Sequence, residues 1–191
     1  QNAAPPVFLD MLGEGVDAEP QHVHVDLDIG DDGEAVLALA QVFERLGADP
    51  DVRVVIITGR GASFCAGGDL GWMRDQMAGG EDAQRGAAYK LSGMLRAINT
   101  IPKPVIARVQ GNAFGGGVGI ISVCDVAVCV ETAKFGLTET KLGLVPATIG
   151  PYVVAKLGAS MARRVFMSSR VLTGKSFTTV RIACLYLPTR N

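Results

Sequence analysis

The chain has 191 residues, 48 % hydrophobic and 19 % charged, so it can bury a domain-sized core and is not a disordered polyelectrolyte. Its formal net charge of −1 gives no overall positive field, and we expect neither DNA nor a membrane as partner. The longest uncharged run, residues 109–124, contains five glycines and is shorter and more polar than the ~20 apolar residues of a bilayer span.

The predicted elements alternate along the chain. Residues 23–29 alternate apolar and polar side chains like a strand, and residues 34–47 have the apolar spacing of a helix. After these come a buried strand (52–59), a glycine-rich loop (59–70), a helix (81–99), a second buried strand (104–111), a glycine-rich loop entering a short helix (112–124) and a third strand (125–130). Mixed loop and short strand over 132–150 precede helical patches at 151–158 and 160–169. This order predicts an α/β fold.

Charge is distributed unevenly along the chain. All 19 acidic residues lie within residues 1–139, whereas residues 140–191 contain no acid and eight basic residues. A basic end of this kind favours contact with phosphates. It is equally consistent with a solvated surface whose bases face the acids of the front half, and the sequence leaves both interpretations open.

The cysteines and histidines form no metal-binding pattern. The four cysteines contain no C-x-x-C pair, and the only histidines are His22 and His24, so we predict no metal site. Unpaired cysteines with apolar neighbours are typical of a reducing compartment, and the N-terminus lacks the basic flank of a secretory signal. We therefore expect a cytoplasmic protein with four small, buried cysteines.

Two loops share one design, in which a buried strand runs into glycines and a helix follows. They are FCAGGDL over 64–70 and FGGGVG over 114–119. Glycine lets a ligand approach the backbone, and N–H groups at a helix start can hold a phosphate or an oxyanion. Neither loop matches a nucleotide-binding motif. A purely structural explanation of the glycines is tight helix–strand packing, which also favours glycine. Two such loops, one helix and one strand apart, predict a two-donor oxyanion hole.

Glu139 is the candidate proton-transfer group. After the second loop the remaining acids are Asp125, Glu131 and Glu139, and Glu139 lies in the largely apolar stretch FGLTETKLGLVP. A carboxyl group in apolar surroundings has a raised pKa and can act as acid or base near neutral pH. A surface glutamate paired with Lys141 or Lys134 is the equally open alternative.

Three long segments resemble the crotonase (enoyl-CoA hydratase/isomerase) superfamily, from about Glu34 to Leu172. They read VRVVIITGRGASFCAGGDLGWM, IPKPVIARVQGNAFGGGVGIISVCDVAV and AKFGLTETKLGLVPATIGPYVV. The resemblance implies a spiral of ββα turns that binds an acyl-CoA thioester, with coenzyme A as part of the substrate and no separate cofactor. FCAGGDLGWM and PATIGPYVV are most similar to the subgroup of methylglutaconyl-CoA hydratases of leucine breakdown.

The resemblance also implies roles for single residues. The thioester oxygen would lie between the backbone N–H groups of Gly68 and Gly116, and Glu139 would move the proton. Asp125 would be structural. Residues that would line the coenzyme A and acyl path, or hold the reacting water through a backbone N–H, are Ala66, Asp69, Leu70, Gly71 and Ala147.

One departure leaves the reaction open. The first of the two glutamates that family hydratases use corresponds to Gly119, whereas double-bond isomerases of the family use one glutamate. We expect a lyase that adds water to an enoyl-CoA, such as 3-methylglutaconyl-CoA, whose distal carboxylate Lys141 or Arg163 could meet. The alternatives are a Δ3,Δ2-enoyl-CoA isomerase and a non-catalytic acyl-CoA- or RNA-binding relative. The resemblance to the wider family also implies a role in fatty acid metabolism.

The resemblance covers the middle of the chain. Residues 1–33 match the family poorly, residues 34–172 form the predicted spiral core, and residues 173–191 are an atypical basic tail. The C-terminal helices that build trimers in the family have no counterpart in this sequence. We expect a homotrimer or hexamer if the chain is complete.

Overall fold

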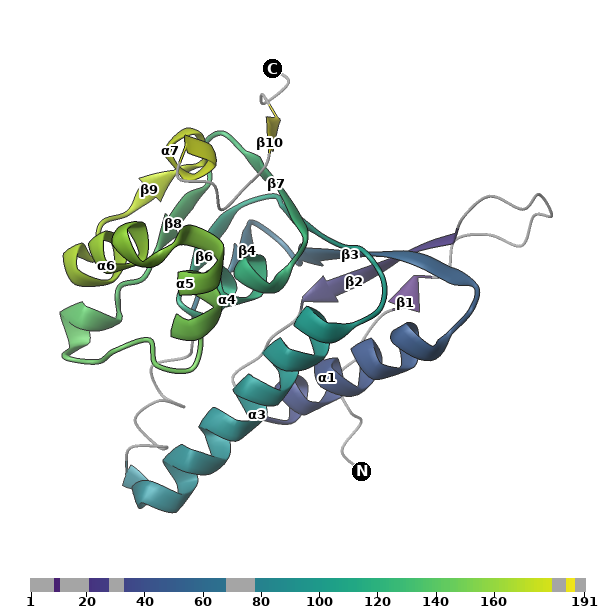
Figure 1. Ribbon diagram of the computed structural model, residues 1–191, viewed down its shortest axis with the longest axis horizontal. Helices are drawn as coiled ribbons and strands as arrows, with labels where there is room; N and C mark the ends of the chain where they lie inside the picture. The colour runs from purple at the N-terminus through teal and green to yellow at the C-terminus, as the bar shows by residue number, and fades with distance from the viewer. Residues whose placement is uncertain (1–8, 11–20, 28–32, 68–77, 180–184, 188–191) are drawn as a thin grey trace.

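The computed structural model describes residues 9–10, 21–27, 33–67, 78–179 and 185–187, which form two sheets and their surrounding helices (Figure 1). The larger, six-stranded sheet has the order β1-β2-β3-β5-β7-β10. Its strands are β1 (Leu9–Asp10), β2 (Gln21–Leu27), β3 (Val52–Gly59), β5 (Val105–Val109), β7 (Val126–Val130) and β10 (Leu185–Leu187). Only the β1–β2 pair is antiparallel; all other neighbours run parallel.

Apolar, β-branched residues explain the central strands of this sheet. In β3, VRVVIITG has Val55 and Ile57 fully buried, and in β5 Ala107 is equally buried. Such strands suit a parallel sheet whose inner face is covered by helices. The predicted strands at 52–59, 104–111 and 125–130 are confirmed as β3, β5 and β7.

Two long helices cover one face of the larger sheet. They are α1 (Gly33–Ala48) and α3 (Gly80–Thr100); they pack side by side, and α1 also contacts β3 (Figure 1). Each is amphipathic: Phe43 of α1 and Met94 and Leu95 of α3 are fully buried in the shared core. The predicted helices at 34–47 and 81–99 are therefore confirmed, with ends one residue longer.

A smaller, four-stranded sheet carries the two glycine loops. Its order is β4-β6-β8-β9, with β4 (Ser63–Cys65), β6 (Asn112–Phe114), β8 (Lys134–Gly136) and β9 (Leu172–Thr173). β4, β6 and β8 are parallel neighbours, and β9 is antiparallel to β8. β4, β6 and β8 each follow a strand of the larger sheet, so the pairs β3–β4, β5–β6 and β7–β8 repeat one ββ unit.

Short helices gather around the smaller sheet (Figure 1). They are α4 (Gly116–Val123), α5 (Gly150–Leu157), α6 (Ala159–Ser168), α7 (Gly174–Thr179) and a single 3-10 turn, η1 (Glu139–Leu142). α4 packs against α5, and α5 against α6. The helical patches predicted at 151–158 and 160–169 are confirmed as α5 and α6.

The sequence analysis missed β4 and β6. Both are three-residue strands inside segments that were predicted as loops. The alternation of a ββ pair with a helix is the α/β spiral that the resemblance implied. Among the described residues, no helix is long and apolar enough to span a bilayer.

Candidate active site

The ends of three parallel strands bring together the two glycine loops and the predicted acid. Cys65 of β4 is paired with Ala113 of β6, and Phe114 of β6 with Gly136 of β8. The chain then continues into the first glycine loop after β4, the second after β6, and η1 after β8. Because carboxyl ends of parallel strands share one edge of a sheet, segments 75 residues apart meet there (64 to 139 in the sequence).

Gly115 lies beside the Glu139 carboxylate. Its φ of +50° and ψ of −115° are a backbone conformation that side chains rarely adopt, and its N–H donates to the Gly136 carbonyl at 3.1 Å. A Cβ atom added to Gly115 would lie 3.2 Å from Glu139 Oε1. The carboxylate therefore packs against the start of α4, and only glycine leaves it this room.

The first loop reaches the same point. A Cβ added to Gly115 would lie 3.9 Å from Gly67 Cα, and Gly67 itself has a φ of +102°. The two glycine loops and the Glu139 carboxylate thus form one cluster, as the resemblance implied for an active site. Gly68, the predicted first oxyanion donor, lies outside the described residues.

Gly116 begins α4 at this cluster. A Cβ added to Gly116 would meet no atom within 4 Å, so space is open beside it. Its N–H lacks a backbone partner among the described residues, as expected in a first helical turn. The neighbouring N–H of Gly117 faces the Cys65 sulfur instead, and burial still raises the pKa of the Cys65 thiol. Gly116 is therefore the amide of this turn that remains available to a ligand.

Glu139 is half-buried, and one of its carboxylate oxygens is enclosed without a partner among the described residues. Its Oε2 atom is inaccessible to solvent and has no hydrogen-bond partner within the described part of the chain. Burial raises the pKa of its carboxyl above the ordinary value, and its own backbone N–H offsets a smaller part of this effect. Among the described residues, no ion pair joins Glu139 to Lys141 or Lys134, the partners of the alternative in which it is a surface glutamate.

The turn that carries Glu139 is tied to α6. The Leu144 N–H donates to the Glu139 carbonyl at 3.0 Å, which closes the turn. The Thr140 hydroxyl donates to the Phe166 carbonyl at 3.3 Å and also hydrogen-bonds to the Ser169 hydroxyl. Ser169 is the residue that ends α6 in a left-handed conformation, with φ +47°. These hydrogen bonds hold the turn that carries Glu139 in place. No sequence pattern predicted them.

Gly119 is closed off by Ile149. A Cβ added to Gly119 would lie 2.5 Å from Ile149 Cγ2 and 2.9 Å from Ile149 Cβ. Ile149 is buried, with 3 % of its surface exposed. Ile149 therefore occupies the space that a side chain at position 119 would need, which is the position of a glutamate in family hydratases. A larger residue at 119 cannot be accommodated without moving Ile149.

The remaining predicted site residues have mixed outcomes. Ala66 is exposed directly after β4, and Ala147 is exposed with its N–H donating to the Val145 carbonyl at 2.8 Å. Asp69, Leu70 and Gly71 lie outside the described residues. Lys141 and Arg163 are both exposed. The predicted substrate contacts of all these residues stay predictions.

Gln110 is a residue that the sequence analysis missed. Its Nε2 donates to the carbonyls of Gly59 (2.7 Å), Ser63 (2.9 Å) and Gly61 (3.2 Å), and its Oε1 accepts from the Gly59 N–H at 3.2 Å. The side chain thereby fixes the turn between β3 and β4, and with it the direction in which the first glycine loop leaves. A polar residue directly after a buried strand was its only signal.

These parts are the ones needed for acid–base chemistry at a carbonyl group: helix-start amides for a developing oxyanion and one buried carboxylate to move a proton. A profile of the "Enoyl-CoA hydratase/isomerase" family matches residues 32–180. The chain belongs to this family.

Individual relatives agree with the assignment. An enoyl-CoA hydratase from Alternaria alternata is 39 % identical over 132 residues, 69 % of this chain and 42 % of the relative. Human mitochondrial methylglutaconyl-CoA hydratase is 35 % identical over 144 residues, 74 % of this chain and 42 % of the relative. The crystal structure of an enoyl-CoA hydratase from Shewanella pealeana has a TM-score of 0.83 and 32 % identity, and the match covers 87 % of this chain and 64 % of that one. The chain thus has the crotonase fold and spans about two fifths of these two curated relatives.

Proposed function

We propose that this chain binds an enoyl-CoA thioester and catalyses addition of water to its double bond. The observation that carries the proposal is the Glu139 carboxylate, whose Oε2 is enclosed without a partner among the described residues and whose Oε1 lies beside Gly115. A buried acceptor without a hydrogen bond costs about 1–3 kcal/mol, and this cost is explained if a substrate or water completes the site.

The thioester oxygen would be held by backbone amides. Gly116 stands at the start of α4 beside open space, and Gly67 of the first loop lies near Gly115; on this proposal, Gly68 supplies the second N–H. Amides aimed at an oxygen that gains charge stabilise the enolate, and loss of one such donor costs about 10²–10³ in rate.

Glu139 would perform both proton transfers. As a carboxylate it removes a proton from water while the water oxygen bonds to C3, and the electrons of the double bond move onto the thioester oxygen as an enolate. The protonated Glu139 then returns its proton to C2, the enolate reverts to the thioester, and the carboxylate is regenerated. The raised pKa of this carboxyl makes its carboxylate a stronger base, which favours the first transfer, the removal of a proton from water.

For the acyl group we propose 3-methylglutaconyl-CoA. The support is the 35 % identity to the human methylglutaconyl-CoA hydratase and the segments FCAGGDLGWM and PATIGPYVV. On this proposal the protein acts in leucine breakdown, and the exposed Lys141 or Arg163 is available to meet the distal carboxylate.

One observation favours a second reaction, the isomerisation of a 3-enoyl-CoA to a 2-enoyl-CoA. Ile149 fills the space beside Gly119, so the site offers one carboxylate and an apolar wall. With a single acid, the simplest chemistry is that Glu139 takes a proton from C2 and returns it to C4 while the amides hold the dienolate.

The two reactions separate in one set of assays. Purified protein is mixed with crotonyl-CoA, 3-methylglutaconyl-CoA or a 3-enoyl-CoA, and the absorbance of the conjugated thioester is followed. A hydratase lowers the absorbance of the first two, and an isomerase raises that of the third. Folded protein that changes none of them would contradict both reactions and leave the acyl-CoA- or RNA-binding alternative, for which a steep salt dependence of RNA binding is the signature.

A further inference from the structure

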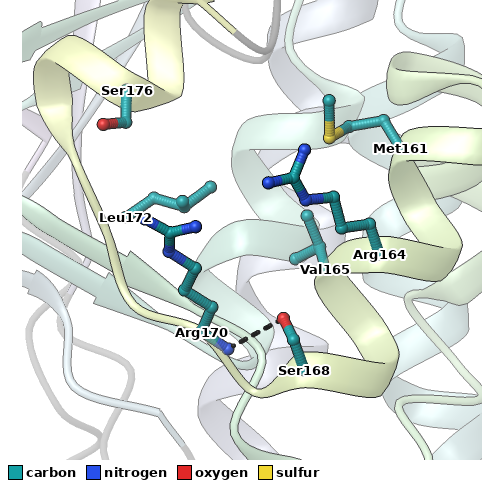
Figure 2. A pocket seen from close by; sticks show the side chains of 7 residues that line it. All are labelled: Met161, Arg164, Val165, Ser168, Arg170, Leu172 and Ser176. Carbon is teal, nitrogen blue, oxygen red and sulfur yellow. Dashed lines mark hydrogen bonds between the residues drawn. The ribbon is translucent and has the colours of Figure 1, made fainter.

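A cavity of about 210 Å³ lies apart from the predicted catalytic residues, between α6, β9 and α7 (Figure 2). It is lined by Met161, Arg164, Val165, Ser168, Arg170, Leu172 and Ser176. It shares no residue with the glycine loops or with η1, so its occupant would not be the reacting part of an acyl-CoA.

Two arginines face this cavity. Figure 2 shows the Arg164 side chain entering from α6 and the Arg170 side chain entering from the segment after α6. Within the described residues, neither guanidinium forms an ion pair with a carboxylate, and residues 140–191 contain no acid at all. Both arginines are exposed, so their guanidinium groups are accessible to an anion from solvent.

The rest of the wall narrows the class of anion. Met161, Val165 and Leu172 give the cavity an apolar side. The Ser168 hydroxyl accepts a hydrogen bond from the backbone N–H of Arg170 at 3.3 Å and keeps its own proton to donate. Guanidinium forks and a hydroxyl suit a group with several acceptor oxygens. An apolar wall beside them suits a carbon chain attached to that group.

We propose that this cavity, the α6–α7 pocket, binds a small organic phosphate: a phosphate monoester whose oxygens meet Arg164 and Arg170 and whose short apolar group packs on Leu172 and Val165. The site is separate from the catalytic cluster, and the proposal does not depend on the proposed hydratase activity.

The test is isothermal titration calorimetry at fixed ionic strength with butyl phosphate, inorganic phosphate and butyrate. Butyl phosphate should bind most tightly, because it alone has both the phosphate and the alkyl chain. Inorganic phosphate binding equally well would overturn the role of the apolar wall, and butyrate binding more tightly would overturn the assignment of a phosphate.

Variants locate the binding. Arg164→Gln and Arg170→Gln should each weaken butyl phosphate binding by about tenfold or more, the effect expected from loss of one charge-assisted partner. Arg163→Gln is the matched control, since Arg163 is exposed on the same helix, carries the same charge and does not line the pocket; its affinity should stay within about twofold.

An equal loss in all three variants would mean general charge attraction, and binding that survives Arg164→Gln and Arg170→Gln would place the ligand elsewhere; either result rejects the pocket. If a glutamine variant does not fold, Arg164→Lys and Arg170→Lys keep the charge while removing the planar fork, and should still weaken binding. Unchanged affinity in both lysine variants contradicts the proposal.

Discussion

Asp125 and Glu139 flank the third ββ unit of the chain, and their carboxylates are treated in opposite ways. Asp125 Oδ2 accepts the Val105 N–H at 2.8 Å, and the Asp125 N–H donates to the Val105 carbonyl at 3.0 Å. Lys156 Nζ also donates to the Asp125 carbonyl at 3.3 Å. Glu139 Oε2 is enclosed and has no partner in the described part of the chain.

The difference separates a structural acid from a chemical one. The hydrogen bonds of Asp125 join β7 to β5, as expected of a structural residue. The Asp125 side chain is exposed and its Oδ2 already accepts a backbone N–H, so it serves the sheet rather than a substrate. Glu139 keeps its lone pairs at the expense of stability, which is typical of a functional site.

The largest expected effect is on turnover. Glu139→Gln keeps the size of the side chain and removes the proton-transfer group, so it should lower kcat by about 10² or more in either proposed reaction. Enoyl-CoA turnover measures this. Asp125→Asn is the matched control: it makes the same change at the acid that joins β7 to β5 and should leave turnover per folded molecule unchanged. A Glu139→Gln enzyme with normal kcat would remove Glu139 from the mechanism.

The next effect is on stability at α4. Gly119→Ala places a Cβ 2.5 Å from Ile149 Cγ2 and should lower the free energy of unfolding by about 1–3 kcal/mol. Gly93→Ala in α3, where an added Cβ meets nothing within 4 Å, should instead raise it by about 0.5–1 kcal/mol. Urea denaturation compares them. If Ile149→Ala does not reduce the cost of Gly119→Ala, the clash is not with Ile149.

Asp125 should matter for stability alone. Asp125→Ala removes a charge-assisted hydrogen bond to the Val105 N–H at a partly exposed site, so unfolding should become easier by about 1–2 kcal/mol. Thermal or urea denaturation gives the loss, and turnover per folded molecule should be normal. A large fall in kcat with unchanged stability would reverse the roles assigned to the two acids.

Thr140 is expected to position Glu139. Thr140→Val keeps the shape of the side chain but removes its hydrogen bonds to Phe166 and Ser169, with an expected cost of about 1 kcal/mol in stability. If the turn moves, kcat should fall severalfold with little change in KM. Thr138→Val, at the residue directly before Glu139, is the control. Equal effects of the two changes would argue against a specific role for the Thr140 link.

The smallest effect is a pH dependence of stability. Because burial raises the pKa of Glu139, the folded state binds its proton more tightly than the unfolded state does. The contribution of this group to stability is therefore complete below the ordinary glutamate pKa and is lost as pH rises through the raised value. The stability of Glu139→Gln relative to the natural chain should grow from pH 4 to pH 7. A difference that stays constant over this range would contradict the burial of this carboxyl.

Strands and helices with a pronounced pattern of apolar residues could be predicted from the sequence. The apolar, β-branched run of β3 and the amphipathic spacing of α1 and α3 identify these elements without knowledge of their partners. β4 and β6 are three residues each within glycine-rich segments, so only their pairing with neighbours defines them.

The candidate site divides in the same way. Glu139 and the glycine loops stand out by residue type and apolar context. The resemblance identified Gly119 as the position where the family's first glutamate is absent. Three contacts were not predicted: Ile149 with Gly119, the hydrogen bonds of Gln110 to the β3–β4 turn, and the hydrogen bond of Thr140 to Ser169. Each joins segments 29 to 51 residues apart. Such contacts depend on the final packing, and no periodicity in the sequence reports them.

The most direct test of the central claim is hydrogen exchange at C2 of 3-butenoyl-CoA in D₂O, followed by NMR. If Glu139 removes the C2 proton while the amides of the glycine loops stabilise the enolate, the natural chain should incorporate deuterium at C2, Asp125→Asn should do so at the same rate, and Glu139→Gln should be slower by about 10². Equal exchange by the natural chain and Glu139→Gln, or none above the buffer rate in the natural chain, would contradict the account.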